Sequence, residues 1–392
     1  MIFNHELNNG ILTIYLEGAI DSTNCNDLEE RINPIILNIP HTGLRLDFGK
    51  VSYISSAGLR LVLKLCKGCQ DFAIMETNNE VYEIFDMTGF TNILHIYRKA
   101  REVSIAGCPL IGNGAYGRVY RINDDTIVKS YFRGNPMKEI ERERQMAQAA
   151  FVLGIPTAIS YDVVKVVEEN CFGAVYELIK ADSLMQCFMG NPDDYDKYLK
   201  EYHNLLVLLS KTKVEGDQIP DCVSDLKDRL GYIKPLLNHK SYERIEKMVL
   251  DIAESKGFVH GDCHFKNIFM VDGQLILIDM DTICKGPFIL EIANIYRTYC
   301  AFEEVNPGDN LHFLGVDGKW TKKLYTDLFN LLFGKKPNPE MIQSKIRFLA
   351  FTLLLSHYVQ KPEKYAKMIE KTLAIIESEL PQIDNLKIPD PD

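Results

Sequence analysis

Apolar and polar positions follow two different patterns along this chain. In the first hundred residues, a segment at 10–18 (GILTIYLEG) alternates apolar and polar side chains as a half-buried strand does. Apolar strand patterns recur at 43–48 and 71–75, and a helical pattern follows each of the three strands. Strands that alternate with helices in this way predict a compact α/β domain.

Beyond about residue 106 the pattern changes to a strand-rich stretch followed by a helical one. Residues 119–122 and 126–131 are β-rich and flank an Asn/Asp turn, which predicts a hairpin. Residues 136–151 have a helical composition, and 173–179 has the character of a buried strand. From about Lys319 onward, leucines and isoleucines repeat at helical spacing. We therefore predict a second domain that begins with strands and ends with helices.

The segment 260–267 (HGDCHFKN), followed by Leu277-Ile-Asp279, carries the most specific chemical signal. Asp262 is followed five residues later by Asn267, and Asp279 comes twelve residues after that. Phosphoryl transfer needs one carboxylate beside the attacking hydroxyl, plus an amide and a carboxylate that hold magnesium on the phosphates. The order predicts Asp262 as the catalytic residue and Asn267 and Asp279 as metal ligands. The alternative is a polar loop between strands that contains these residues by coincidence.

An independent signal is the pattern GNGAYGRV at 112–119, with glycines at positions 112, 114 and 117. A GxGxxG pattern also opens dinucleotide-binding folds, but there it must lead directly into a helix. Here it leads into the predicted hairpin, which favours a loop that covers nucleotide phosphates. We therefore predict Gly112, Gly114 and Gly117 as nucleotide-binding residues, since glycine lets the backbone approach the phosphates closely. Lys129, on the strand after the turn, is expected to hold the phosphates, and a surface lysine is the alternative.

Such a lysine needs a carboxylate partner on the next helix. Ile140, Ala147 and Phe151 fall on one face of the predicted helix, and Glu143 shares that face. We predict that Glu143 forms the ion pair with Lys129, with Glu141 as the alternative.

These residues together resemble the kinase-like phosphotransferases, and specifically the aminoglycoside/choline-kinase-like branch, over about residues 106–380. Protein kinases carry His-Arg-Asp in the catalytic loop, whereas His260-Gly-Asp262 is similar to the small-molecule branch. The resemblance implies a bilobal α+β fold with a helical C-terminal lobe, ATP and Mg²⁺ as cofactors, and a small-molecule hydroxyl as acceptor. In kinases the adenine bonds to backbone groups at the linker after a buried strand, which implies main-chain contacts from Glu177 and Ile179.

The first hundred residues resemble a STAS domain, the fold of anti-sigma-factor antagonists. In that family a serine two residues before a glycine, at a helix N-terminus, is phosphorylated by a partner kinase. Ser56, in the run Ser55-Ser-Ala-Gly58, matches it. Phosphorylation of Ser56 and a STAS-domain partner protein are therefore expected from the resemblance, and ordinary capping of the helix by Ser56 is the alternative.

The two resemblances imply three parts in sequence. Residues 1–102 would form a STAS-like regulatory domain of the α/β class, 103–179 the N-terminal lobe of the kinase-like domain and 180–392 its helical C-terminal lobe. A charged stretch at 98–102 marks the predicted boundary.

Composition narrows the function classes. The 392 residues with 46% hydrophobic content allow two domains with sizeable cores. A net charge of −10 argues against nucleic acid or an anionic membrane surface as a partner. No apolar run approaches the ~20 residues of a membrane span, and no signal peptide is recognisable. We therefore expect a cytoplasmic enzyme with reduced cysteines, ten in number, of which the single CxxC at 66–69 lacks the second pair of a zinc site.

Three functions are compatible with these residues. The first is a kinase that transfers the γ-phosphate of ATP to a hydroxyl of a small molecule, with the STAS unit for regulation or docking. The second is a protein kinase-like enzyme that acts on a STAS-domain serine. The third is a nucleotide-binding signalling scaffold with little turnover.

Overall fold

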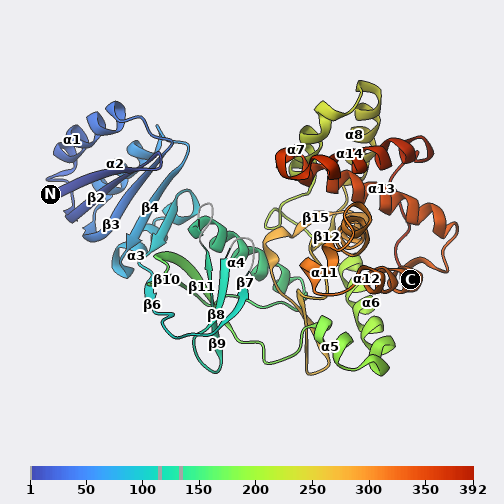
Figure 1. Cartoon of the computed structure of the whole chain (residues 1–392). Coiled ribbons are helices and arrows are strands. Elements are labelled where there is room, and N and C mark those ends of the chain that lie inside the picture. The colour runs from blue at the N-terminus through green and yellow to red at the C-terminus, as the bar shows by residue number, and fades with distance from the viewer. Residues whose placement is uncertain (1, 114–116, 132–135) are drawn as a thin grey trace. The chain divides into compact units, whose positions relative to one another are not determined.

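The computed structural model describes residues 2–113, 117–131 and 136–392. Gly114, one of the three predicted loop glycines, lies outside these ranges. The chain forms two compact units (Figure 1). The first contains residues 1–104 and 164–167, and the second contains 105–163 and 168–392.

A five-stranded sheet in the order β1-β2-β3-β4-β5 is the centre of the first unit. The first two strands are antiparallel, and the remaining neighbours are parallel. Asn9 and Gly10, both with positive φ, turn the chain between β1 and β2 as an Asn-Gly hairpin turn does. The strands are β1 (Ile2–Asn8), β2 (Ile11–Ile20), β3 (Gly43–Ile54), β4 (Phe72–Thr77) and β5 (His95–Arg98), and the helices are α1 (Cys25–Asn38), α2 (Ser56–Cys66) and α3 (Asn79–Met87).

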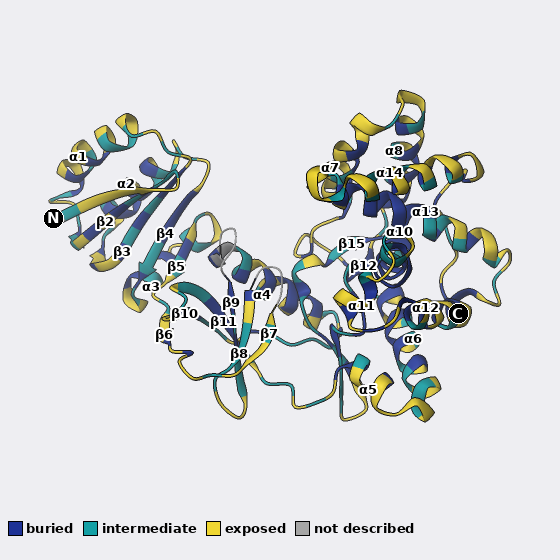
Figure 2. Cartoon of the chain, viewed as in Figure 1, coloured by how far each residue is buried: buried dark blue, intermediate teal, exposed yellow. Residues whose placement is uncertain are grey.

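The core of this unit follows directly from the alternation in the sequence. Leu12, Ile14 and Leu16 of β2 are buried and alternate with more exposed neighbours, because successive side chains of a strand point to opposite faces. Buried positions recur along β3 and β4, as Figure 2 shows. The strand at 43–48 is longer than predicted, since β3 runs to Ile54.

An antiparallel sheet with the order β11-β9-β8-β7 begins the second unit. The predicted hairpin is present: β8 and β9 pair from Gly117 opposite Tyr131 to Arg121 opposite Ile127. Strand β10 (Asp162–Val166), whose residues 164–166 belong to the first unit, pairs in parallel with β6 (Arg101–Val103) of that unit. The remaining elements of this part are β7 (Leu110–Asn113), β8 (Gly117–Arg121), β9 (Thr126–Tyr131), α4 (Pro136–Val152) and β11 (Cys171–Glu177).

Helix α4 matches the predicted helix, but one residue of its apolar face was wrongly expected to be buried. Ile140 and Ala147 are buried, whereas Phe151 is 59% exposed. Phe151 lies in the last turn of the helix, which ends at Val152, so no further turn of α4 covers it.

The rest of the second unit is mainly helical, with the predicted C-terminal helices in place. Helix α13 is its centre, and residues 348–356 of this helix are all buried. None of the described helices is long and apolar enough to cross a membrane. The helices are α5 (Leu184–Gly190), α6 (Tyr195–Lys211), α7 (Val223–Ile233), α8 (His239–Ala253), α9 (Phe288–Tyr296), α10 (Phe302–Val305), α11 (Asp309–Leu314), α12 (Gly318–Phe333), α13 (Pro339–Tyr358) and α14 (Pro362–Glu379), and the strands are β12 (Gly257–Val259), β13 (Ile268–Val271), β14 (Gln274–Leu277) and β15 (Cys284–Gly286).

Candidate active site

A short hairpin brings the two predicted metal ligands together. Strands β13 and β14 pair with Ile268 opposite Leu277, so Asn267 and Asp279 lie at the same open end. The backbone N–H of Ile278 donates to the carbonyl of Asn267 over 2.9 Å. Asp279 has the left-handed backbone conformation (φ 67°, ψ 64°), which is unfavourable for a residue with a Cβ. Such strain is found most often at functional sites, where the surrounding structure enforces it.

The catalytic loop is held in place by His260 and Glu291, both buried. The Nδ1 atom of His260 accepts the backbone N–H of Asp262 at 3.3 Å, and its Nε2 lies 3.2 Å from the carbonyl oxygen of Ile278. Burial lowers the pKa of His260, which fits a neutral ring that donates from Nε2. A carboxylate oxygen of Glu291, on α9, accepts the backbone N–H groups of His260 and Gly261. The loop is therefore fixed both to Ile278, the residue after β14, and to α9.

Two neighbouring side chains contact the predicted catalytic carboxylate. His264 Nε2 is 3.5 Å from Asp262 Oδ2, and Asn267 Nδ2 donates to the same oxygen over 3.0 Å. Burial acts to raise the pKa of Asp262, but the His264 hydrogen bond and the charges of His264 and Arg297 lower it to about 2. Asp262 is therefore ionised at neutral pH. Because Asn267 donates through its nitrogen, its amide oxygen has no partner among the described residues and is available for a cation.

Lys129 lies between two carboxylates that are far apart in the sequence. Its Nζ is 3.0 Å from Glu143 and 2.8 Å from Asp279, so the expected ion pair with Glu143 is present. Burial alone would lower the pKa of Lys129, but the charges of Glu143 and Asp279 raise it. The hydroxyls of Tyr131 and Tyr176 donate to Glu143 over 2.6 and 3.0 Å. The ammonium group is thus held by a carboxylate that is itself fixed by two tyrosines.

The chemistry of this donor set suits Mg²⁺ together with phosphates. Asp279 and Asn267 offer one carboxylate and one amide oxygen, the hard oxygen ligands that magnesium prefers. Burial, followed by the charges of Asp279 and Glu143, raises the pKa of Asp281 to about 7. The carboxylates of this cluster therefore repel one another, and a bound cation would reduce that repulsion. In the described ranges no three His, Cys, Asp or Glu side chains form a metal cluster, but magnesium on a nucleotide needs fewer protein ligands.

Two of the loop glycines are described, and one of them has a structural reason to be glycine. Gly112 belongs to β7, and Gly117 begins β8. A Cβ at Gly117 would collide with the carbonyl oxygen of Ser130 on the neighbouring strand. Close packing between β8 and β9 therefore already requires glycine at this position. The prediction that Gly112 and Gly117 bind nucleotide stays a prediction.

The chain leaves the sheet at the predicted adenine linker. Strand β11 ends at Glu177, and the backbone N–H of Leu178 donates to the carbonyl of Asp125 over 2.8 Å. Ile179 is the next residue after Leu178, which makes this last bond. Main-chain contacts from Glu177 and Ile179 to a base remain a prediction.

In the first unit, Ser55 rather than Ser56 caps helix α2. The hydroxyl of Ser55 accepts the backbone N–H groups of Ala57 and Gly58 at 3.2 and 3.4 Å. Capping by Ser56, the alternative considered above, is therefore wrong, because Ser56 already belongs to the first turn of the helix. Its side chain is exposed.

Several contributors to the site were not predicted from the sequence. Tyr131 lies two residues after Lys129 and therefore on the same face of β9, which is a signal for Tyr131 alone. No pattern connects Tyr176 to Glu143. Arg297 belongs to a helix that follows the motifs, and no pattern connects it to Asp262. All ten cysteines are free, including Cys263 of the catalytic loop.

Comparison with known proteins assigns both parts of the chain. The profile of the phosphotransferase enzyme family matches residues 107–312, and that of the STAS domain matches residues 3–103. The chain is 32% identical over 101 residues to the putative anti-sigma factor antagonist BtrV of Bordetella bronchiseptica, covering 25% of this chain and 85% of that protein. It is 21% identical over 202 residues to probable choline kinase 2 of Arabidopsis thaliana, covering 48% of this chain and 56% of that protein.

Among solved structures, the ADP-bound aminoglycoside phosphotransferase APH(2'')-Ib aligns with 13% identity and a TM-score of 0.48, covering 78% of this chain and 99% of that one. The predicted resemblance, the fold class and the kinase type of enzyme are confirmed by the two family matches. The chain belongs to the phosphotransferase enzyme family, and it carries a STAS domain ahead of the phosphotransferase domain.

Proposed function

We propose that this protein transfers the γ-phosphate of ATP to a hydroxyl group of a small molecule, and that its STAS domain regulates or docks the enzyme. The observation that supports this most is a single connected network. Asp262 bonds to Asn267, Asn267 is paired through the hairpin with the strand that precedes Asp279, and Asp279 bonds to Lys129. The four residue types that phosphoryl transfer requires thus meet in one place.

The surroundings of each residue support the role proposed for it. Lys129, fixed by Glu143, would hold the phosphates of the nucleotide, and Asn267 and Asp279 would hold Mg²⁺. When bound, Mg²⁺ would neutralise the phosphate charge that develops during transfer. Lys129 also contacts Asp279 directly, so the phosphate-holding group and the proposed metal ligand adjoin.

Asp262 would orient the acceptor and receive its proton. The acceptor oxygen forms a bond to the γ-phosphorus as the bond to the β-phosphate oxygen of ATP breaks, and the hydroxyl proton passes to Asp262. A carboxylate with a pKa of about 2 is a weak base. This suits a loose transition state, in which the proton leaves late and positioning contributes most.

A second candidate function concerns the STAS serine. Ser56 is exposed and is not the helix cap, so its hydroxyl is available for phosphorylation. A phosphate at a helix N-terminus is favoured by the helix dipole. The STAS domain of this or another chain is therefore the alternative acceptor.

Thermal unfolding with and without MgATP tests nucleotide binding, and phosphotransfer to a panel of hydroxyl metabolites tests catalysis. A ligand at a hundred times its dissociation constant stabilises the folded state by about 2.7 kcal/mol. Mass spectrometry of the protein in the same reactions reports transfer to its own serines. If saturating MgATP leaves the unfolding temperature unchanged, the proposed function is wrong.

A further inference from the structure

Arg297 has an unusual place in the helical part of the second unit. It is the first residue of a π-helical segment (Arg297–Ala301) that continues α9, and the other four residues of this segment are buried. Isolated π-helical turns are rare and are frequently found at functional sites. The segment is also tied to the catalytic loop, because the hydroxyl of Tyr299 accepts the backbone N–H of Phe265 over 2.9 Å. The segment that begins with Arg297 is therefore fixed to the loop that carries Asp262.

The guanidinium of Arg297 carries a charge that no described residue pairs. Its Nε is buried without a hydrogen-bond partner, and within the described ranges the side chain forms no ion pair. Burial lowers the pKa of Arg297 to about 10, so the group stays charged at neutral pH. The residue as a whole is half-buried, so its terminal N–H groups, unlike Nε, remain accessible. An accessible guanidinium without a protein partner is a place where an anion can bind.

The acids near Arg297 do not supply that anion. Asp262 is close enough for Arg297 to lower its pKa, yet the two side chains are not in ion-pair contact. Asp225 on α7 is already paired with Arg229, at 2.6 Å from its Nε. Arg229 adds a second positive charge on the Arg297 side of the site. A ligand that reaches from Asp262 to Arg297 would meet a carboxylate at one end and a cation at the other.

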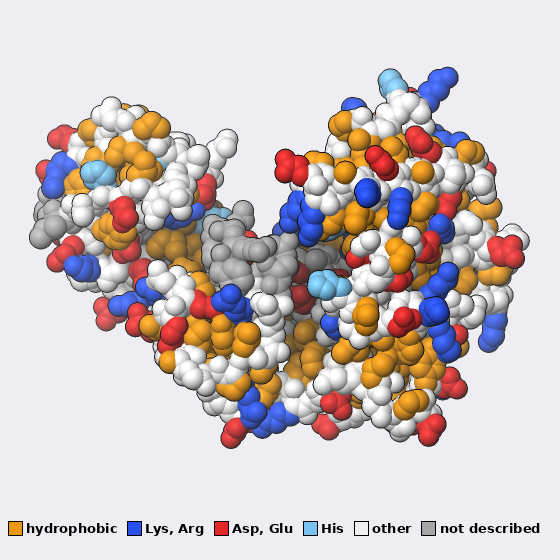
Figure 3. Space-filling model, viewed as in Figure 1, with side chains coloured by type: hydrophobic (Ala, Val, Ile, Leu, Met, Phe, Trp, Pro, Cys, Tyr) orange, Lys and Arg blue, Asp and Glu red, His pale blue; other side chains and the backbone are white. Residues whose placement is uncertain are grey.

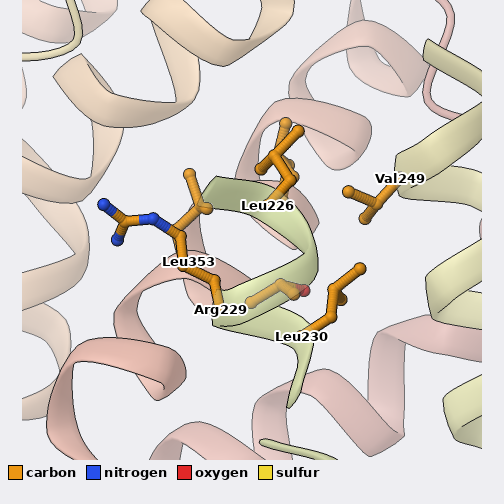
Figure 4. A pocket seen from close by; sticks show the side chains of 7 residues that line it. Leu226, Arg229, Leu230, Val249 and Leu353 are labelled. Atoms are coloured by element: carbon orange, nitrogen blue, oxygen red, sulfur yellow. The ribbon is translucent and has the colours of Figure 1, made fainter. Parts of the chain in front are cut away.

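The apolar pocket beside Arg229 is not where such a ligand binds. It is lined by Leu226, Leu230 and Val249, among others, and its volume is about 10 Å³. That is room for about one water molecule. Figure 4 shows the guanidinium of Arg229 directed away from these side chains. The pocket is a packing gap, and the charged end of Arg229 lies outside it.

We infer that Arg297 binds an anionic group of the phosphate acceptor, a carboxylate or a phosphate monoester, while the acceptor hydroxyl lies at Asp262. This inference rests on the proposed function and names its substrate class. The planar guanidinium presents paired N–H groups that match carboxylate and phosphate oxygens. It would repel a cationic acceptor of the aminoglycoside or choline type. The whole chain is acidic, and acidic and basic side chains are interspersed over the face seen in Figure 3, so this positive charge is a local feature.

Binding of simple anions tests the assignment without knowledge of the natural acceptor. The nucleotide site is first filled with magnesium and a non-hydrolysable ATP analogue. Glycerate and glycerol 3-phosphate are then titrated calorimetrically, beside ethanolamine and choline as cationic hydroxyl compounds. We expect wild type to bind the anions and Arg297→Gln to bind them at least about tenfold more weakly, since charge-assisted hydrogen bonds are lost. Arg297→Lys should retain part of the affinity, and the exposed Arg244→Gln should match wild type.

A stability measurement separates a ligand-binding role from a structural one. If Arg297 serves a ligand, Arg297→Gln should unfold at about the same temperature without ligand, because the guanidinium makes no hydrogen bond or ion pair with the described residues. Equal anion binding in wild type and Arg297→Gln, no anion binding in wild type, or preference for the cations would each overturn the assignment. Failure of the ATP analogue to bind would instead overturn the proposed function, and the titration on the protein alone would still decide the role of Arg297.

Discussion

Replacement of Asp262 by asparagine separates catalysis from nucleotide binding. Asparagine keeps the size of the side chain, and its amide oxygen can still accept the bond that Asn267 Nδ2 donates over 3.0 Å. What it removes is the negative charge beside His264, and with it the group that receives the acceptor proton. The folded structure should therefore persist, while the chemical step loses its proton acceptor.

The magnitude follows from the ionisation state of Asp262. A pKa of about 2 means that the wild-type carboxylate is charged throughout the neutral range, so the full effect of the charge is lost at pH 7. A positioned acid or base contributes about 10²- to 10⁴-fold to turnover, or about 2.7 to 5.5 kcal/mol of barrier. The affinity for MgATP should change by less than about tenfold, because Lys129, Asn267 and Asp279 are the residues proposed to hold the nucleotide and its metal.

Turnover and MgATP affinity should be measured on the same preparation, with Asp272→Asn as the matched control. Asp272 is exposed in the turn between β13 and β14 and has positive φ, which asparagine tolerates well. The control should behave as wild type. Full activity of Asp262→Asn, or a loss of nucleotide affinity as large as the loss of turnover, would refute the role given to this residue.

Three further outcomes are expected. Asp279→Ala should abolish the magnesium-dependent part of the stabilisation by ATP, and thermal unfolding with and without magnesium would show an unchanged difference if Asp279 is not a ligand. Burial raises the pKa of Glu291 from 4.5 to about 7, so its contribution to stability is fully present below pH 4.5 and is lost as pH rises to about 7. The free energy of unfolding in urea should be up to about 3 kcal/mol lower at pH 8 than at pH 5, and this difference should be absent in Glu291→Gln. The same dependence of the unfolding free energy on pH in both proteins would contradict this. If Ser56 is phosphorylated in the presence of MgATP, intact-mass analysis should show the phosphate lost in Ser56→Ala but kept in Ser55→Ala. Ser55→Ala alone should lose about 1 kcal/mol of folding free energy, because the helix cap is removed. A phosphate retained in Ser56→Ala would show that another residue carries it.

The local arrangement of the candidate site was the part of this protein that its sequence predicted best. Asp262, Asn267 and Asp279 could be expected to lie close together because one short loop and one hairpin, built by a single stretch of chain, position them, and their roles stay predictions. Glu143 could be chosen over Glu141 because helical periodicity alone places it on the buried face. The strands of the first unit are recognisable for a similar reason, since one face of each is in the core.

Contacts between distant segments were not predictable in this way. Tyr131 and Tyr176 converge on Glu143 only after two strands pair in a particular register, and a single sequence does not give that register. Arg297 depends on how α9 packs beside the catalytic loop. Which of Ser55 and Ser56 caps α2 depends on the exact residue at which the helix begins. A sequence pattern does not distinguish two hydroxyl side chains at neighbouring positions.

The hairpin of β13 and β14 also determines where this active site can change in length. Asp272 and Gly273 form its two-residue turn, and both have positive φ. Residues added at that turn would leave Asn267 and Asp279 at the opposite, open end. A single residue inserted within either strand would instead reverse the side chains beyond it and separate the two ligands. Natural length variation and engineered insertions should therefore be tolerated at Asp272-Gly273, and a search for relatives should allow the interval between the two ligands to vary there.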